Sequence, residues 1–408
     1  MKPLEGLKVI ELGMYATAPS VTRLLCDWGA EVIKVESPTG DNTRYSGAQS
    51  RLPTQPDCSL LFSIMNSGKK LVSLNLKTPD GMEIMEKLLA DADIFVSNTR
   101  YGGLTRLGLD YESLHQRHPR LVCCYISGYG FEGAEKDKPG FDLTSFWART
   151  GILNALRDPG CVPRFPPPGI GDLSTANVAA AGILAAIYQR SVTGEGMQVK
   201  TSLMATGIWC NYNHITSGQD RPPTDPLEPI RSPEDFKKWR NPFYHIYKCK
   251  DERLFFLLGG AYSKLHTTLQ ALGLGDLAED PKYKNHAAMQ KNSGELYDIM
   301  IEVFAQKTSA EWAKMMSEMD IPYEILAENT ELSKDPQAWE NGFLTHLHCP
   351  NGSTYVVPNT PVEFSGVPRE LPTHPGTIGC DTREILTSLG YTPQQIEDLL
   401  QRQVAVIA

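Results

Sequence analysis

Asp172 is the residue whose type and setting are best suited to chemistry. It lies in the run GIGDLST (169–175), directly before an Ala-rich segment with the pattern of a helix. Glycines leave a carboxylate open to approach, and the dipole of a following helix favours its ionised form by about 0.3–1 kcal/mol. Such a carboxylate can act as a nucleophile. It could instead cap the helix, although Ser174 and Thr175 stand closer to the helical residues and are alternative caps.

Histidines and cysteines offer two other kinds of site. His346 and His348 stand beside Cys349, but no second cluster completes a tetrahedral zinc site, so we expect solvated histidines and no metal. The nine cysteines are odd in number and contain no CxxC pair, which predicts reduced thiols rather than disulfides. A cysteine-nucleophile hydrolase would need His and Asn or Asp partners that the sequence cannot place.

Alternating strand and helix patterns surround Asp172. Residues 7–12 and 30–36 alternate like strands around a helical stretch at 19–28, which predicts a βαβ unit. Further strands are expected at 71–76, 94–98, 121–127 and 197–201. Helices are expected to start at Pro79, with Thr78 as its cap, and at Ser174. The pattern predicts an α/β fold with an open, mostly parallel, Rossmann-like sheet, whose ligands bind at the carboxyl ends of its strands.

Several ligand classes are disfavoured. The first loop, residues 13–19, lacks the GxGxxG fingerprint, so no nicotinamide or flavin dinucleotide is expected, although its amides could meet a phosphate or adenine. The formal charge of -9 and the lack of a basic block argue against nucleic-acid binding. No apolar run reaches the roughly 20 residues of a membrane span, and no signal peptide is evident. We therefore expect a cytoplasmic protein without a membrane partner.

Composition divides the chain. At 408 residues it exceeds the usual size of a single core, and a Pro-rich, charged stretch follows residue 218. A hairpin at 244–258 and helices near 263–271, 294–306 and 309–319 come next, then a strand pattern at 321–326 and two closing helices. We predict a large Rossmann-like domain from residues 1–217, a linker and smaller α+β domain at 218–320, and a return to the large domain at 321–408.

Eight segments in order along the chain resemble class III CoA-transferases. They are LEGLKVIEL (4–12), GAEVIKVE (29–36), NSGKK (66–70), LNLK (74–77), RLGL (106–109), PGFD (139–142), GD (171–172) and TREILTSLGY (382–391). Each segment alone is weak, but together they span essentially the whole chain. The resemblance implies an interlocked homodimer whose large domain is built from both chain ends, and it places the family's catalytic aspartate at Asp172.

The resemblance also implies where coenzyme A binds. The expected contacts to its phosphates and adenine are Ala16, Thr17, Lys77, Asn98, Arg100, Arg106 and Lys138. Phe141 and Gly171 are expected to border the substrate pocket. Gly259 and Gly260 match a glycine loop that covers the active site in some relatives, or they simply turn the chain. No permanently bound cofactor is expected, since a coenzyme A thioester is the substrate.

The implied reaction moves CoA from an acyl-CoA thioester to a free carboxylic acid through a covalent intermediate on Asp172. Residues 139–151 are similar to transferases of amino-acid-fermenting anaerobes, which predicts a 2-hydroxy acid with an apolar or aromatic side chain and an enoyl-CoA donor. Two alternatives are a racemase of 2-methylacyl-CoA esters and an inactive CoA-binding relative. The racemases use a histidine where this chain has Phe141, and proton transfer on opposite faces needs two acid/base groups.

Overall fold

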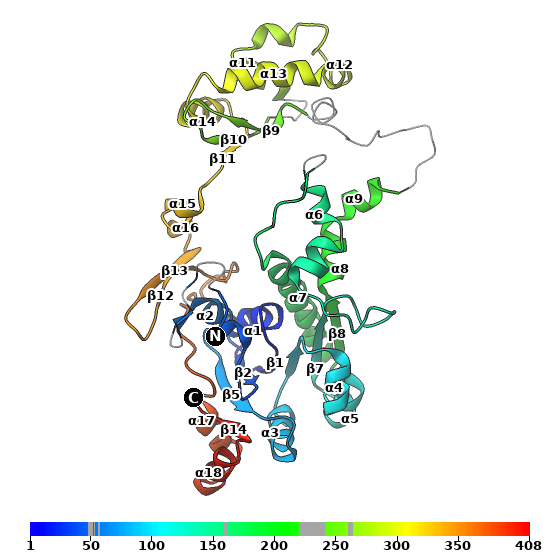
Figure 1. The fold of residues 1–408 in the computed structure, drawn as a ribbon, viewed down its shortest axis with the longest axis vertical. Helices are drawn as coiled ribbons and strands as arrows, with labels where there is room; N and C mark the ends of the chain where they lie inside the picture. The colour runs from blue at the N-terminus through cyan, green and yellow to red at the C-terminus, as the bar shows by residue number, and fades with distance from the viewer. Residues whose placement is uncertain (48–51, 53, 56–57, 158–160, 220–240, 260–263) are drawn as a thin grey trace. The chain divides into compact units, whose positions relative to one another are not determined.

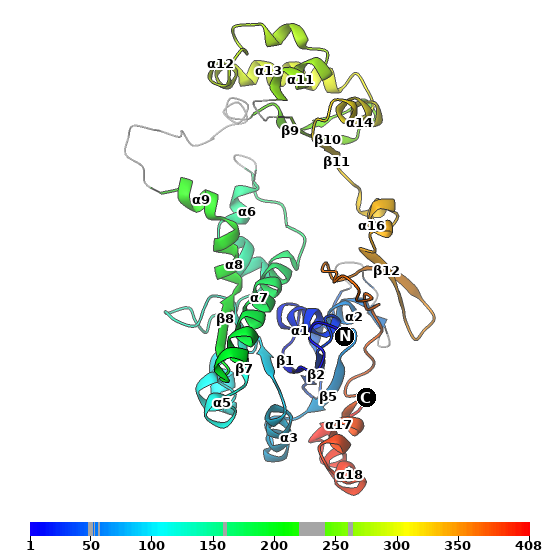
Figure 2. The same cartoon turned by 180° about the vertical axis from the view of Figure 1, so that it is seen from behind.

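The computed structural model describes the chain except for residues 48–51, 53, 56–57, 158–160, 220–240 and 260–263. The chain forms two compact units, which we describe separately (Figures 1 and 2). The first contains Met1–Ala155, Phe165–Gln219 and Asp335–Ala408, and the second contains Leu156–Arg164 and Asp220–Lys334. Both chain ends therefore belong to the larger unit.

The larger unit is built on an open sheet. Among the described residues, seven strands run in the order β14-β5-β2-β1-β6-β7-β8. Their bounds are β1 Lys8–Leu12, β2 Glu31–Glu36, β5 Lys70–Leu74, β6 Ile94–Ser97, β7 Val122–Ser127, β8 Gln198–Ser202 and β14 Ala405–Val406. All neighbours are parallel except β14 and β5. The predicted Rossmann-like fold class is confirmed, and the strand order reverses between β1 and β6.

Helices cover both faces of this sheet because its strands are apolar on both sides. Val9 of β1 packs in a core with α1 (Thr17–Asp27) and α7 (Ile170–Thr193). Its neighbour Ile10 packs in a second core, on the opposite face. That core contains α3 (Pro79–Ala90), α4 (Tyr101–Leu107), α5 (Tyr111–Arg117), α17 (Thr382–Ser388) and α18 (Pro393–Gln401). As predicted, Pro79 opens α3, and the Thr78 hydroxyl accepts from the Gly81 amide at 3.1 Å.

The carboxyl end of the chain completes the sheet. After α17 and α18, which agree with the two predicted closing helices, β14 pairs antiparallel with β5 through Ala405 and Leu74. The Asp381 carboxylate accepts a hydrogen bond from the Leu71 amide at 2.7 Å. β14 has two residues. A segment that short carries no alternating pattern, so it could not be predicted from the sequence.

Shorter elements join these layers in the larger unit. They are α2 (Leu60–Asn66), α6 (Ile152–Ala155), α8 (Leu203–Cys210), α9 (Tyr212–Ser217), α16 (Pro336–Glu340), the turns η1 (Asn42–Arg44) and η3 (Asp142–Ala148), and the hairpins β3 (Thr54–Gln55) with β4 (Cys58–Ser59) and β12 (Leu344–His348) with β13 (Thr354–Pro358). η3 is a π-helical turn that packs on α7 and α8. It matters for the site described below.

The second unit is a smaller α+β body. Its antiparallel sheet contains β9 (Tyr244–Lys248), β10 (Leu254–Leu258) and β11 (Tyr323–Ile325). Its helices include η5 (Gly275–Ala278), α11 (Leu265–Ala271), α12 (His286–Lys291), α13 (Ser293–Phe304), α14 (Ser309–Glu318) and α15 (Asn329–Leu332). The sequence predicted a return to the large domain at 321, but Ile325 pairs with Phe255 of β10 and the return comes at Asp335. An alternating pattern predicts a strand, but it does not show which strand that segment pairs with.

Helix α7 and residue Cys349 bear on two further expectations. α7 is long and apolar enough to cross a membrane by length and composition, with 39% of its apolar window buried. The core helix of a globular protein can have the same length and composition, and Ala176 and Ala179 of α7 do pack in the sheet core. Cys349 is disulfide-bonded, although the sequence predicted reduced thiols. Disulfide pairing depends on which segments meet in the fold, and the cysteine spacing did not reveal it.

Candidate active site

Asp172 lies inside the first turn of α7 rather than in the loop before it. The N-cap residue Gly169 adopts a φ of 91°, a left-handed conformation that glycine tolerates without strain. The first amides of a helix need acceptors from elsewhere. Asp142 supplies them: its Oδ2 accepts from the Gly169 amide at 2.8 Å and its Oδ1 from the Asp172 amide at 3.2 Å. The capping alternatives for Asp172, Ser174 and Thr175 are therefore wrong, because α7 starts four residues before Ser174.

Gly171 is required by close packing. A Cβ atom there would lie 2.3 Å from Cγ of Phe146 and 2.4 Å from Oδ1 of Asp142, both in η3. Phe146 is buried and cannot move aside cheaply. The missing side chain lets η3 approach α7 closely enough for Asp142 to reach the helix end. Gly171 is not one of the residues that line the pocket described below.

The Asp172 carboxylate is partly buried, and Thr17 at the start of α1 holds it. The Thr17 hydroxyl donates a hydrogen bond to Asp172 Oδ1. Burial raises the pKa of Asp172 to about 6; the bond from Thr17 opposes this rise, and the charge of Asp142 adds to it. Asp172 is therefore ionised in most molecules at pH 7 and protonated well below pH 6. Its ion has lost part of its hydration, which suits a carboxylate that attacks an electrophile.

The loop between β1 and α1 brings Thr17 to this position. Asn98, directly after β6, holds the loop with both ends of its amide: Nδ2 donates to Met14 O at 2.8 Å, and Oδ1 accepts from Met14 N at 3.0 Å. Tyr15 adopts a φ of 62°, which is uncommon for a residue with a side chain. Ala16 is the N-cap residue of α1 and forms no side-chain capping bond. Thr17 and Asn98 thus have structural partners that the sequence did not reveal.

A pocket of about 520 Å³ opens at the carboxyl ends of β1, β6 and β7, beside the reversal of strand order. Its lining includes Met14, Tyr15, Asn98, Thr99, Arg100, Ile126, Ser127, Gly128, Phe131, Lys136, Lys138, Gly140 and Phe141. Arg100 and the two lysines supply positive charge, and the aromatic residues supply apolar surface. Lys138 also forms an ion pair with Glu135, with 2.7 Å between Lys138 Nζ and Glu135 Oε1. The pocket can therefore take a ligand that is anionic at one end and apolar at the other.

Two aromatic rings border this pocket close to the residues that touch Asp172. Phe141 is 54% exposed, and its ring meets that of Tyr15 edge-on with 5.6 Å between the centroids. The Tyr15 hydroxyl accepts from Asn42 Nδ2 at 2.7 Å, which fixes the ring. Phe141 directly precedes Asp142, and Tyr15 comes two residues before Thr17. The pocket wall is thus tied to both contacts of Asp172.

Two other predicted contacts of the larger unit do not line this pocket. Lys77 after β5 and Arg106 on α4 are exposed, and neither lines it. Gly259 follows β10 in the second unit, where a Cβ atom would lie 2.8 Å from Thr268 Oγ1. Gly260 lies outside the described residues, so the choice between lid and turn stays open. Across the described part of the chain, no group of three His, Cys, Asp or Glu is arranged to hold a metal ion.

Comparisons with known proteins identify the family. The model of CoA-transferase family III matches residues 4–382. The chain belongs to CoA-transferase family III. This confirms the resemblance carried by the eight sequence segments, and with it the predicted class of enzyme.

Relatives with curated names agree with this assignment. (R)-2-hydroxy-4-methylpentanoate CoA-transferase of Clostridioides difficile is 36% identical, over 98% of this chain and 99% of the relative. Cinnamoyl-CoA:phenyllactate CoA-transferase of Clostridium sporogenes is also 36% identical, over 97% of this chain and 95% of the relative. A solved CAIB/BAIF family protein from Brucella suis is 27% identical and matches 95% of this chain and 99% of its own with a TM-score of 0.77.

Sequence reasoning missed the part played by Asp142. The residue was noted only as the end of the PGFD segment, 30 positions before Asp172. One signal was available: a helix that starts after a glycine brings no capping side chain of its own, so an acceptor must come from another segment. The sequence does not say which segment supplies it.

We expect Asp172→Asn to stabilise the protein above pH 6 and to have little effect below about pH 4. The pKa of Asp172 is raised from 3.8 to about 6 on folding, so wild-type stability falls as the pH rises between these values. Two pKa units correspond to ~3 kcal/mol, and partial exposure reduces the expected gain to ~1–2 kcal/mol. Urea unfolding from pH 4 to pH 8 measures this gain, with the exposed Asp137→Asn as control. A gain independent of pH would contradict the assignment.

Proposed function

We propose that the protein exchanges coenzyme A between an acyl-CoA thioester and a free carboxylic acid, with Asp172 as the covalent carrier. The observation that supports this most is a partly buried, ionisable carboxylate at a helix N-terminus, held by Thr17 beside a pocket of mixed charge and polarity. Membership of CoA-transferase family III agrees with it. The family assignment supports the reaction class, and the geometry of the site supports Asp172 as the carrier.

The exchange proceeds through two kinds of bond to Asp172. The carboxylate attacks the thioester carbonyl carbon, the C–S bond breaks, and CoA leaves as a thiolate, which forms a mixed anhydride. The thiolate then attacks the aspartyl carbonyl carbon, releases the donor acid as a carboxylate and leaves CoA on Asp172 as a thioester. The acceptor carboxylate repeats these steps in reverse order. Amides at the start of α7 and the Thr17 hydroxyl can stabilise the oxyanions that form.

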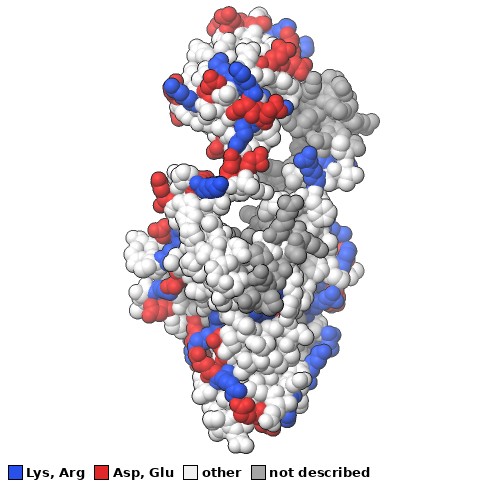
Figure 3. Space-filling model, turned by 60° about the vertical axis from the view of Figure 1, so that its left-hand side comes forward, with Lys and Arg blue, Asp and Glu red and all other residues white. Residues whose placement is uncertain are grey.

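We assign the pocket to coenzyme A. Arg100, Lys136 and Lys138 would meet its phosphates, and the Phe141 side would face the thioester. Ala16, Thr17 and Asn98 shape this pocket because they form or hold the loop between β1 and α1. Lys77 and Arg106 do not line the pocket, so they would contact CoA only through a part of it that extends beyond the pocket. On the face in Figure 3, acidic and basic side chains of the described residues are interspersed. A surface that binds nucleic acid would need a continuous basic stretch, whereas a small anion needs only a few basic side chains.

We propose that the acceptor is a 2-hydroxy acid with an apolar or aromatic side chain and that the donor is an enoyl-CoA. The two relatives at 36% identity are named for 2-hydroxy-4-methylpentanoate and for phenyllactate with cinnamoyl-CoA. The Tyr15 and Phe141 rings offer a matching apolar wall. The racemase alternative lacks support, because Phe141 cannot take up or return a proton.

We further propose an interlocked homodimer in the cytoplasm. α7, α8 and α9 expose large apolar side chains, which monomeric surfaces rarely gather. We call these the α7–α9 face: Leu173, Val178, Tyr188, Val192, Trp209 and Tyr212. A second copy of the chain is the partner that the family resemblance implies. A second copy that covers this face would also explain why α7, although apolar, is only partly buried in one chain. No membrane is then needed to explain it.

Covalent trapping tests the carrier. Mixed with an acyl-CoA donor and then with hydroxylamine, the wild-type protein should carry a hydroxamate on the tryptic peptide 165–190, because hydroxylamine attacks the aspartyl thioester carbonyl and releases CoA. Asp172→Asn should lose the adduct and at least roughly 10³-fold of the exchange rate. Asp276→Asn, at an exposed carboxylate of η5 in the second unit, should keep both. An adduct on another peptide, or full exchange by Asp172→Asn, would refute the mechanism.

An acid panel tests the substrate. We expect kcat/KM for 2-hydroxy-4-methylpentanoate and phenyllactate to exceed that for oxalate, succinate and carnitine by roughly tenfold or more. Burying an isobutyl or phenyl group in an apolar pocket yields ~2 kcal/mol, and 1.4 kcal/mol is a factor of ten. Phe141→Ala should reduce this difference in kcat/KM between the 2-hydroxy acids and the other acids. A better rate with a dicarboxylate or a betaine would contradict the proposed acid class.

The α7–α9 face can be tested by mass. Light scattering should give twice the chain mass of 45.2 kDa for the wild type. Trp209, 78% exposed, contributes no core packing in one chain, so Trp209→Asp should shift the population toward the single-chain mass. Gln394→Asp, on the first turn of α18, is the matched control. A wild type that stays at 45.2 kDa at micromolar concentration would rule the dimer out.

A further inference from the structure

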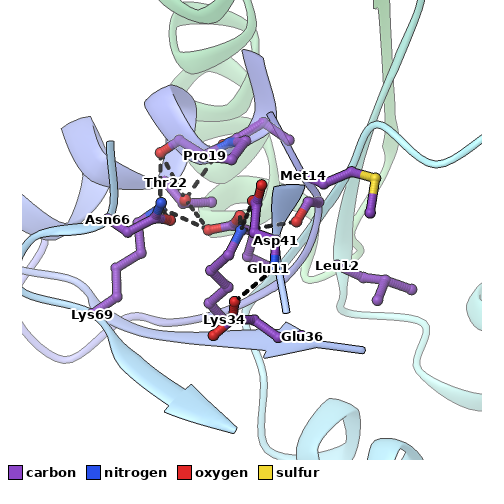
Figure 4. A network of polar contacts seen from close by, with 12 residues as sticks. Glu11, Leu12, Met14, Pro19, Thr22, Lys34, Glu36, Asp41, Asn66 and Lys69 are labelled. Carbon is purple, nitrogen blue, oxygen red and sulfur yellow. Dashed lines mark hydrogen bonds and ion pairs between the residues drawn. The ribbon is translucent and has the colours of Figure 1, made fainter. Parts of the chain in front are cut away.

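Four charged side chains are buried together near the carboxyl ends of β1 and β2 (Figure 4). They are Glu11, Lys34, Asp41 and Lys69, each at most 5% exposed, and we call them the Glu11 cluster. Glu11 and Lys34 are register partners on neighbouring parallel strands. Removing four charges from water is costly unless each one is paired.

The Glu11 cluster is paired and electrically balanced. Lys34 Nζ lies 2.7 Å from Glu11 Oε1 and 3.0 Å from Asp41 Oδ2, and Lys69 Nζ lies 2.8 Å from Glu11 Oε2. Burial by itself would raise the pKa of Glu11, but the two lysines outweigh it and lower that pKa to about 2. The cluster therefore holds two positive and two negative charges near neutral pH.

The same side chains also bond the backbone on both sides of Thr17. Lys34 Nζ donates to Gly13 O at 2.8 Å, and Lys69 Nζ donates to Pro19 O at 2.8 Å. Asp41 Oδ1 accepts from the Tyr15 amide at 3.2 Å. Ion pairs that served the sheet alone would not require backbone bonds that bracket one active-site side chain.

We propose that Lys34 and Lys69 are positioning residues for the active site. From the buried side they fix Gly13 and Pro19, which sets the hydrogen bond from Thr17 to Asp172 and thereby the reactivity of Asp172. This inference rests on the proposed function, because it assigns a role in the same reaction. The loop is closely packed, since a Cβ atom on Gly13 would lie 2.7 Å from Ala18 Cβ. A change in the cluster therefore moves Thr17.

The pKa of Asp172 reports on this coupling. Burial and the charge of Asp142 raise this pKa, and the bond from Thr17 lowers it, so a displaced Thr17 would change it. Burial lowers the pKa of Lys69 to about 8, which lies well above the range in which Asp172 titrates. The two titrations can therefore be separated.

The test compares Thr17→Val with a charge-balanced pair, Lys34→Met with Asp41→Asn, which removes one charge of each sign and the bond to Gly13. Glu11→Gln with Lys69→Met is the second balanced pair and removes the bond to Pro19. In each background, the pKa of Asp172 is read from the pH dependence of the stability gained by Asp172→Asn. This reading needs no turnover, so it stands apart from the proposed chemistry. Exchange assays then add kcat and KM.

Thr17→Val should raise the pKa of Asp172 by about 0.5–1 unit, because the ionised form loses one hydrogen bond. Each balanced pair should raise it similarly and lower kcat roughly tenfold with little change in KM, and adding Thr17→Val should produce no further rise. The matched control is Asp93→Asn with Arg190→Met. That pair lies 2.9 Å apart at the amino ends of the strands, and Arg190 is buried and donates to Asp93 O and Arg120 O instead of the loop. It should lower stability and leave the pKa of Asp172 unchanged.

Two results would overturn the proposal. One is an additive effect of Thr17→Val and a balanced pair on the pKa of Asp172. The other is a balanced pair that loses stability as the control does but keeps the wild-type pKa and kcat. Full exchange by Asp172→Asn together with the coupled pKa rise would instead refute the covalent mechanism and support the positioning role.

Discussion

The carboxylate of Asp142 on the first amides of α7 is the interaction on which the site depends. A helix leaves these amides without partners, and Gly169 offers no side chain to satisfy them. Asp142 does so from a turn that precedes α7 by about 30 residues in the sequence, which joins two distant segments. Since Phe141 adjoins Asp142, the same bond fixes one wall of the pocket. Gly171 makes the approach possible.

Opposing forces then set the state of Asp172. A helix N-terminus favours a carboxylate ion by about 0.3–1 kcal/mol, while a shift of two pKa units corresponds to ~3 kcal/mol in the other direction. Burial therefore wins over the dipole, and the pKa of Asp172 rises to about 6. Thr17 limits the rise. The result is an ion that is present at neutral pH but poorly hydrated, which is favourable for attack on a thioester.

The two sides of the site depend on different kinds of support. Asp172 and Asp142 lie on helical turns packed through buried apolar side chains such as Phe146. Thr17 and Tyr15 lie on a loop, and polar contacts from Asn98, Asp41 and the buried lysines hold that loop. Loops without apolar packing need such bonds to stay ordered. The carboxyl ends of parallel strands bring these polar groups together at the reversal of the sheet order.

Sequence alone determined the class of fold, the family and Asp172 as the candidate residue, because strand alternation, helix caps and the eight segments are local patterns. The β9–β10 hairpin and the start of α3 followed from the same local signals. Tertiary structure decided the partners: Asp142 as the cap, Thr17 on Asp172 and β11 beside β10. It also left Lys77 and Arg106 out of the pocket lining. Hydrogen bonds and burial between distant segments depend on how the layers pack, and no local pattern encodes that.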